Sequence, residues 1–194
     1  MDRREFETLI FGDKFEKREG WYKLFEDKMW VPEWNVPLQA QRETALKRLQ
    51  LTVSKKMVSV RDFKNDVTNI FTAHEMLGGI DPSTGTKFTV QFNLFGGTLM
   101  ALHTERHAHI FDKIDSLQAM GCFLLTEVGY GANAVKMEST ATFDKQKQEF
   151  VLATPTPLSY KYWITNGACH ANYALMFAQT IVNNKNEGVN AFLV

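Results

Sequence analysis

The spacing of apolar residues changes along this chain, and that change limits the folds that the chain can adopt. In the first part, apolar residues recur at steps of three and four, as in Leu46, Leu49 and Val53, which is typical of amphipathic helices. From residue 121 onward the period falls to two, which is typical of half-buried strands. The sequence therefore predicts an α+β fold, with an N-terminal α-helical bundle at residues 1–118 and the start of an antiparallel β-barrel-like domain at residues 119–194.

Several breaks subdivide the helical region. Stripes of apolar residues predict helices around residues 46–60 and 63–77. Gly78-Gly79 and Asp81-Pro82-Ser83 then interrupt the pattern. Residues 88–102 are apolar nearly all round, so they predict a helix near the centre of the bundle, with Phe88, Phe92 and Phe95 as core residues. One more short helix is expected over residues 105–114.

The second region reads as strands joined by polar turns. Residues 137–143 and 150–153 alternate in polarity around a polar connection, which predicts a hairpin. Residues 173–182 and 189–194 predict two further strands, joined by a turn-prone stretch at 183–188. The last strand needs neighbours to satisfy its edge, so we expect the chain to be incomplete.

Charge and composition exclude several classes of protein. Lysine and arginine number 22, and aspartate and glutamate also number 22, so the net charge is zero. Such a balance gives no excess of positive charge that would favour binding to nucleic acid or to an anionic membrane. No apolar run is long enough to predict a membrane span. The two cysteines, Cys122 and Cys169, cannot make a disulfide framework, which indicates a reducing compartment.

Two segments combine the groups that suit a flat, polar-edged heterocycle such as a flavin. Residues 126–133 end an apolar run with a hydroxyl, a carboxylate and two glycines, and residues 161–167 place an indole, a hydroxyl and an amide side by side. The pyrimidine edge of a flavin matches backbone and hydroxyl groups, and its ring face fits an aromatic platform. Glycines let the backbone approach closely. Taken alone, each segment also fits a plain strand-to-turn junction or a buried core tryptophan.

At these residues the chain resembles the flavoprotein superfamily of acyl-CoA oxidases and acyl-CoA dehydrogenases, and the oxidase branch is the nearer match. The resemblance runs with few gaps over about residues 60–194. The motifs that carry it are Phe95-Gly96-Gly97, Thr104-Glu105-Arg106-His107, Gly121-Cys122-Phe123-Leu124-Leu125-Thr126-Glu127, Ala141-Thr142-Phe143-Asp144, Gln148-Glu149-Phe150-Val151 and Thr154-Pro155-Thr156.

The resemblance implies a cofactor, FAD, and roles for particular residues. Thr126 hydrogen-bonds the flavin pyrimidine edge, while Gly129 and Gly131 shape the turn around it. Trp163 lies against one flavin face, and Thr165 lies near the reactive N5. Ala132 replaces the serine that family members usually carry, which leaves Asn133 as the candidate donor to substrate. Glu127 is expected to order the turn.

The same resemblance implies an activity, fatty acyl-CoA and oxygen giving trans-2-enoyl-CoA and hydrogen peroxide in fatty-acid β-oxidation. It places the catalytic glutamate in a region beyond residue 194, so no catalytic residue is assigned and residues 1–194 alone are expected to be inactive. A homodimer and a peroxisomal location are further family expectations. The chain shows no targeting signal, and it does not end in a Ser-Lys-Leu-type address.

Three alternatives stay open. Oxidases often carry glycine where Thr165 stands, and the sequence of residues 163–167 is more typical of the dehydrogenase branch, which passes electrons to a protein acceptor. A catalytically inactive interaction module is a second alternative. A third is a metal site at His103, His107 and His109, but no spaced ligand completes the set, and a solvated helix face is favoured.

Overall fold

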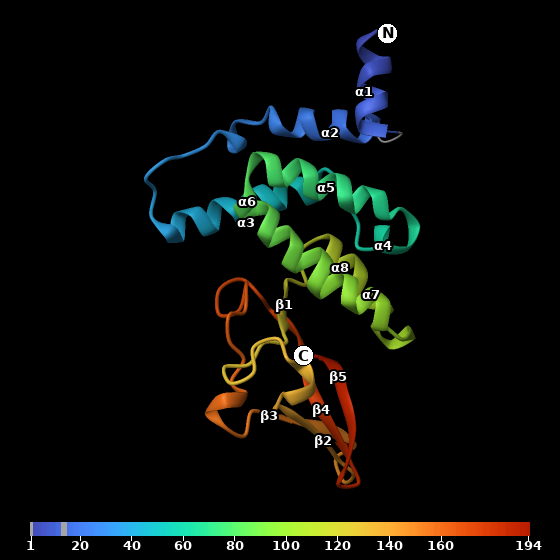
Figure 1. Cartoon of the computed structure of the whole chain (residues 1–194), viewed down its shortest axis with the longest axis vertical. Coiled ribbons are helices and arrows are strands. Elements are labelled where there is room, and N and C mark those ends of the chain that lie inside the picture. Colours follow the sequence, from blue (N-terminus) through green and yellow to red (C-terminus); the bar gives the residue numbers. More distant parts are fainter. Residues whose placement is uncertain (1, 13–14) are drawn as a thin grey trace. The chain divides into compact units, whose positions relative to one another are not determined.

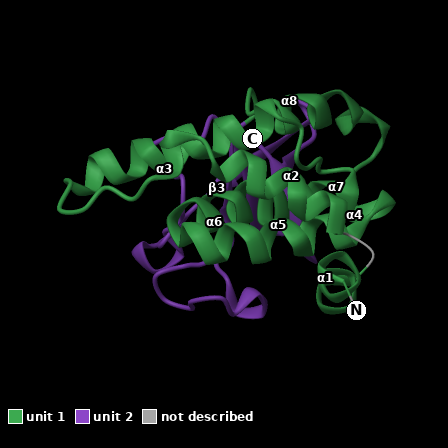
Figure 2. Ribbon diagram, turned by 90° about the horizontal axis from the view of Figure 1, so that it is seen from above, with its two compact units in different colours: residues 1–119 green, residues 120–194 purple. Residues whose placement is uncertain are grey.

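The computed structural model describes residues 2–12 and 15–194 of the chain. The chain forms two compact units, residues 1–119 (unit 1) and residues 120–194 (unit 2). Figure 1 colours the chain along its sequence, and Figure 2 gives each unit its own colour. Unit 1 is helical and unit 2 is built on a sheet. The α+β class predicted from the sequence is therefore confirmed.

Unit 1 contains α-helices together with short 3-10 and π-helical segments. They are α1 (Arg3–Phe11), α2 (Phe15–Phe25), η2 (Lys28–Trp30), α3 (Leu38–Ser54), α4 (Asp62–Asn65), α5 (Val67–Ile80), α6 (Pro82–Phe88), η3 (Thr89–Gly97), α7 (Thr98–Leu102), η4 (Glu105–Ile110) and α8 (Phe111–Asp115). The core of the unit is formed by large apolar side chains that solvent does not reach, among them Trp21, Leu49, Ile70, Leu77, Phe88, Phe92 and Phe95.

The central helix of the unit is continuous but irregular. Residues 88–102 form one helical run, as the sequence predicts, yet η3 within it is a π-helix. Phe88 and Phe92 stack with ring centroids 4.9 Å apart at an interplanar angle of 24°. Both rings and Phe95 are fully buried, which confirms the prediction that all three are core residues.

The break between α5 and α6 falls at Asp81-Pro82, the second of the two interruptions that the sequence predicts. Gly78 and Gly79 do not end α5, which continues to Ile80. The break comes at Asp81, whose side chain accepts a hydrogen bond from the Ser83 backbone, with Pro82 in the first helical turn. Proline lacks the amide that would be unpaired there, so it begins a helix well.

A buried arginine joins three parts of unit 1. Arg48 on α3 donates to the Asp81 carboxylate at 2.8 Å and to the backbone oxygens of Met29 and Val31 at 2.8 and 3.1 Å. These bonds fix the connector between η2 and α3. Burial alone would raise the pKa of Asp81, but hydrogen bonds from Thr84 and Arg48 outweigh it and hold that pKa below its ordinary value.

Unit 2 is a mixed five-stranded sheet centred on its longest strand. Its elements are β1 (Gly121–Leu124), η5 (Ala134–Lys136), β2 (Thr140–Asp144), β3 (Glu149–Ala153), η6 (Pro157–Ser159), β4 (Tyr173–Val182) and β5 (Lys185–Leu193). Along one edge β4 pairs in parallel with β1 and then with β2, and along its other edge it pairs antiparallel with β5. β2 and β3 form the predicted hairpin. The parallel pairs make the sheet mixed, where the sequence suggested antiparallel strands.

The turn between β4 and β5 is shorter than predicted. Asn183 and Asn184 both have a positive φ, 54° and 60°, as a tight two-residue hairpin requires. β5 therefore begins at Lys185, four residues before the predicted start.

Candidate functional site

The two segments singled out in the sequence lie side by side in unit 2. The Tyr162 amide donates to the Thr126 oxygen at 3.0 Å, and the Val128 amide donates to the Tyr160 oxygen at 3.0 Å. The Gly129 amide continues this ladder to the Leu158 oxygen at 2.9 Å. The backbone of residues 126–129 is therefore fixed against residues 158–162, which directly precede the loop that carries Trp163 (the Trp163 loop).

A buried ion pair anchors this junction. Lys161 Nζ lies 3.0 Å from Glu127 Oε1, and the two side chains are 8% and 0% exposed. Lys161 also donates to the backbone oxygens of Leu125 and Phe177, at 3.2 and 2.8 Å. All three ammonium protons are thus used, and they join the end of β1, the Glu127 turn and the middle of β4.

The Glu127 carboxylate has backbone partners as well. It accepts hydrogen bonds from the amides of Glu138 and Ser139, at 2.9 and 3.1 Å, which lead into β2. Burial by itself raises the pKa of Glu127, but the Ser139 side chain, the Glu138 and Ser139 amides and Lys161 together outweigh it, so that pKa lies below its ordinary value. Burial lowers the pKa of Lys161, and Glu127 offsets only part of that effect. Glu127 therefore orders the turn, as expected.

The structure explains why glycine stands at positions 129 and 131 of the turn. A Cβ at Gly129 would stand 2.8 Å from the Leu158 side chain, so a larger residue would push the two segments apart. Gly131 has a φ of 57°, in the left-handed region that favours glycine, and its oxygen and amide both bond Glu127.

The side chains predicted to contact a cofactor differ in exposure. Trp163 is 84% exposed and has a φ of 60°, so its indole stands clear of the core. This placement argues against the plain reading of a buried core tryptophan. Thr165 and Asn133 are exposed, and Thr126 is half-buried.

Asn166 fixes the loop that carries Trp163 and Thr165. Its side chain is buried and donates to the Gly121 oxygen at 3.3 Å, while its own backbone oxygen accepts from the amides of Cys169, His170 and Ala171. The loop is therefore attached to the start of β1 as well as to the Lys161 junction.

Sequence reasoning missed two groups near this site. Lys161 lies at the start of the predicted segment 161–167, but nothing in the local sequence pattern indicates that its side chain reaches Glu127. Glu138 accepts hydrogen bonds from the hydroxyls of Tyr130 and Thr156, which ties the glycine turn to residues 154–157. The Thr-Pro-Thr motif at 154–156 was the one sequence signal that could have indicated the contact between Thr156 and Glu138.

Two histidines of unit 1, His103 and His107, make local contacts at the ends of helices. His103 Nδ1 lies 2.7 Å from the Met100 oxygen, and His107 Nδ1 accepts from the Thr104 amide at 3.1 Å. Among residues 2–12 and 15–194, no group of three or more histidine, cysteine or acidic side chains is placed to hold a metal ion. Over the same residues, no helix combines the length and apolar character that crossing a membrane requires.

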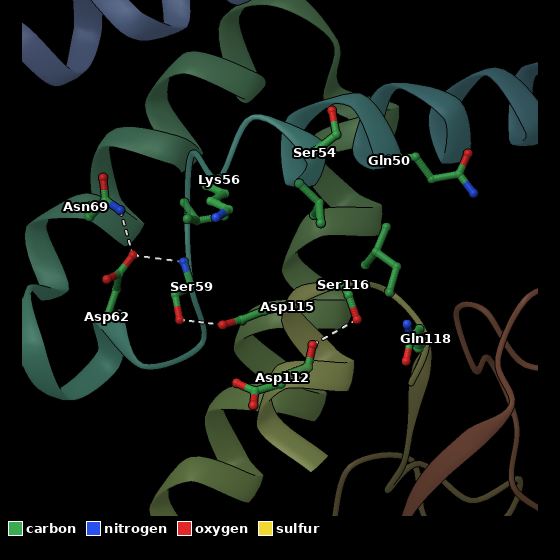
Figure 3. A pocket seen from close by; sticks show the side chains of 13 residues that line it. Gln50, Ser54, Lys56, Ser59, Asp62, Asn69, Asp112, Asp115, Ser116 and Gln118 are labelled. Carbon is green, nitrogen blue, oxygen red and sulfur yellow. Dashed lines mark hydrogen bonds between the residues drawn. The ribbon is translucent and has the colours of Figure 1, made fainter. Parts of the chain in front are cut away.

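Unit 1 contains a separate pocket of about 680 Å³ that the sequence did not reveal (Figure 3). It lies between the end of α3, the loop before α4 and the end of α8. Two of its carboxylates already have internal partners: Asp62 accepts from the Ser59 amide and the Asn69 side chain, and Asp115 accepts from the Ser59 hydroxyl. The Asp115 bond holds the loop onto α8, and the Asp62 bonds join the loop to α4 and α5.

Comparison with other proteins gives consistent relatives. Acyl-coenzyme A oxidase 2 of Arabidopsis thaliana, a peroxisomal protein, is 35% identical in an alignment of 184 residues that covers 89% of this chain and 27% of the relative. Acyl-coenzyme A oxidase acox-3 of Caenorhabditis elegans is 34% identical over 143 residues, 72% of this chain and 21% of the relative. No protein-family profile matches the sequence. The chain spans between 27 and 30% of the length of the first three relatives.

Solved structures agree with the sequence relatives. Acyl-CoA oxidase 1 of Yarrowia lipolytica superposes with a TM-score of 0.80 at 25% identity, over 94% of this chain and 27% of that chain. Acyl-CoA oxidase-2 of C. elegans, crystallised with FAD, ascaroside-CoA and ATP, gives 0.79 at 22% identity, over 100% of this chain and 30% of that chain. The fold is thus the one found in the acyl-CoA oxidases. The sequence relatives add that the chain belongs to the acyl-CoA oxidase family.

Proposed function

We propose that this chain supplies the flavin cradle of an FAD-dependent acyl-CoA oxidase. The observation that carries the proposal is the hydrogen-bonded junction of residues 126–129 with residues 158–162, fixed by Lys161 and Glu127. That junction puts a threonine hydroxyl and an exposed indole on neighbouring stretches of backbone.

The residues of the junction fit a flavin. Thr126 offers a hydroxyl beside exposed backbone of a glycine turn, which matches the carbonyl and N–H groups of a pyrimidine edge. Trp163 offers an aromatic face that the protein itself leaves largely uncovered. Thr165, exposed two residues later, is the candidate donor toward N5, and Asn133 is the candidate donor toward substrate. When bound, FAD supplies the two-electron acceptor that these side chains cannot provide.

The role of this chain's own residues is to bind and orient. A rigid junction positions hydrogen-bond donors in advance, so that little reorganisation is needed when charge develops on a bound group. The Glu127–Lys161 pair provides that rigidity because each of its charges has several partners in unit 2. No residue of this chain is assigned as the base that removes the substrate α-proton.

The proposed overall reaction is acyl-CoA plus oxygen giving trans-2-enoyl-CoA plus hydrogen peroxide. Its support is that the sequence relatives are acyl-CoA oxidases and that a structural neighbour was crystallised with FAD and ascaroside-CoA. A peroxisomal location and a homodimer belong to the same proposal, and the peroxisomal names of the Arabidopsis relatives support the first.

The test is a chimera in which residues 1–194 replace the matching part of the Arabidopsis relative. We expect a yellow protein that binds FAD and produces peroxide from fatty acyl-CoA. Trp163→Ala and Thr126→Val should each weaken FAD binding, measured by flavin absorbance. Trp34→Ala is the matched control, because Trp34 in unit 1 is 82% exposed. Unchanged FAD affinity in both site variants would contradict the proposed cradle.

A dehydrogenase is the second candidate, favoured by one observation. Trp163-Ile164-Thr165-Asn166-Gly167 resembles the dehydrogenase branch, and the structure gives Asn166 of this motif a buried anchoring role. The chimera distinguishes the two: reduction of an electron-transfer protein without peroxide would identify a dehydrogenase.

A further inference from the structure

The alternation of side chains across the junction places an aromatic residue, Tyr162, directly opposite Thr126. Glu127 and Lys161 form an antiparallel bridge. Residues opposite each other on antiparallel strands point to the same face, and their neighbours along each strand point to the other face. Glu127 and Lys161 therefore share one face, where both side chains are buried. Thr126 and Tyr162, whose backbones are hydrogen-bonded at 3.0 Å, share the opposite face, which we call the outer face.

The outer face carries large side chains that solvent reaches. Val128 and Tyr160 are the next hydrogen-bonded pair along the ladder, so they lie on this face as well. Tyr162 is 61% exposed, Tyr160 is 54% exposed and Val128 is 53% exposed. Apolar and aromatic side chains that gather uncovered on one face are typical of a binding surface. Since the ion pair closes the other face, the outer face is the side of the junction that a ligand can reach.

Trp163 places a second ring nearly at a right angle to Tyr162. The centroids of the two rings are 6.5 Å apart, and their planes meet at 83°. Trp163 has a φ of 60° and leaves the regular alternation, yet this ring contact keeps its indole beside the outer face. A flat ring that stacks on the indole lies at right angles to the phenol ring of Tyr162. Edge-to-face contacts of that kind are favourable between aromatic rings.

We propose that Tyr162 is a further flavin-binding residue of the cradle, in contact with the same ring system as Thr126 and Trp163. The inference rests on the proposed function. A flat ring that reaches both of those residues passes Tyr162, because Tyr162 faces the first across the ladder and precedes the second along the chain. The phenol thus packs against the pyrimidine end of the flavin, which the Thr126 hydroxyl meets. Tyr160 lies one pair further from Trp163 and is outside this contact.

The experiment uses the chimera that carries residues 1–194 within the Arabidopsis relative, with FAD binding measured by flavin absorbance. Tyr162→Leu should weaken FAD binding by about tenfold, because a ring contact and its buried apolar area are lost. Tyr162→Phe keeps the ring, so its affinity should stay within about twofold of the parent. Tyr160→Leu is the matched control, because it removes a phenol of similar exposure from the same face. It should also stay within about twofold.

Amide exchange before FAD is added separates a ligand contact from a structural role. The Tyr162 and Val128 amides take part in backbone bonds that no substitution removes, so their protection should match the parent in all three variants. Lost protection in Tyr162→Leu would make the phenol a structural group and overturn the contact. So would equal losses of affinity in Tyr162→Leu and Tyr160→Leu, or a loss in Tyr162→Phe as large as in Tyr162→Leu.

Failure of the inference and failure of the proposed function give different results. A parent chimera that binds no FAD would overturn the proposed function, and this inference with it. A parent that binds FAD, together with a Tyr162→Leu variant that binds it equally tightly, would overturn the role of Tyr162 alone.

Discussion

Replacing Lys161 by methionine tests the junction on which the candidate site depends. Methionine has a similar length but no charge, so the Glu127 carboxylate is left buried without its counter-ion. Removing one partner of a buried pair costs about 3–5 kcal/mol. Both side chains are less than one-tenth exposed, so solvent screening reduces this little. We expect the lower part of that range, because Glu127 keeps two backbone donors.

The assay has to report on unit 2 alone. Urea denaturation followed by hydrogen exchange of peptides from residues 120–194 gives the unfolding free energy of that unit. The amides of Tyr162 and Val128, which bridge the two segments, should lose protection first. Lys185→Met is the matched control, since Lys185 on β5 is 74% exposed and pairs with a surface glutamate. It should change the unfolding free energy by less than about 0.5 kcal/mol.

A double variant checks the cause. Combining Lys161→Met with Glu127→Gln removes both charges, so no uncompensated charge stays buried. The pair of substitutions should therefore cost less than Lys161→Met alone. A loss below about 1 kcal/mol in the single variant, or a still larger loss in the double variant, would refute the reasoning.

Three other predictions concern core packing, backbone approach and pH. Phe92→Ala should destabilise unit 1 by about 3–5 kcal/mol in denaturant titrations, whereas Phe71→Ala, at an exposed position of α5, should cost far less; equal losses would contradict the assigned core. Gly129→Ala should cost about 1–3 kcal/mol because its Cβ meets Leu158, and Leu158→Gly in the same chain should restore part of the loss. The pKa of Glu127 is lowered in the folded state, so the unfolded chain takes up the proton first as pH falls. The unfolding free energy of unit 2 should therefore decrease through the acid range. Glu127→Gln should flatten that decrease when it is measured by urea titration.

Local patterns predicted the elements whose partners are close in the sequence. The β2–β3 hairpin follows from alternation on both sides of a polar turn, and β4 spans the predicted residues 173–182. The parallel pairing of β1 and β2 with β4 depends on residues far apart along the chain, and alternation carries no information about which strand lies beside which. The π-helical segment was equally hidden, because a helix that is apolar all round gives no face from which to read its period.

The candidate site was predicted in part, for a similar reason. Local composition marked the segments at 126–133 and 161–167, and the structure brings them together. The contact that fixes them, Lys161 to Glu127, joins residues from both segments, and a charged pair in an apolar surrounding leaves no local signature. The flavin contacts of Thr126, Gly129, Gly131, Trp163 and Thr165 stay predictions, as does the substrate contact of Asn133.

The central position of β4 has a consequence for biosynthesis. A ribosome releases β1, β2 and β3 well before the strand that receives two of them, so the sheet cannot close while those earlier strands emerge. During that interval the apolar side of β1 is open to other nascent chains, and a chaperone that covers residues 120–172 until β4 appears would raise the yield of folded protein.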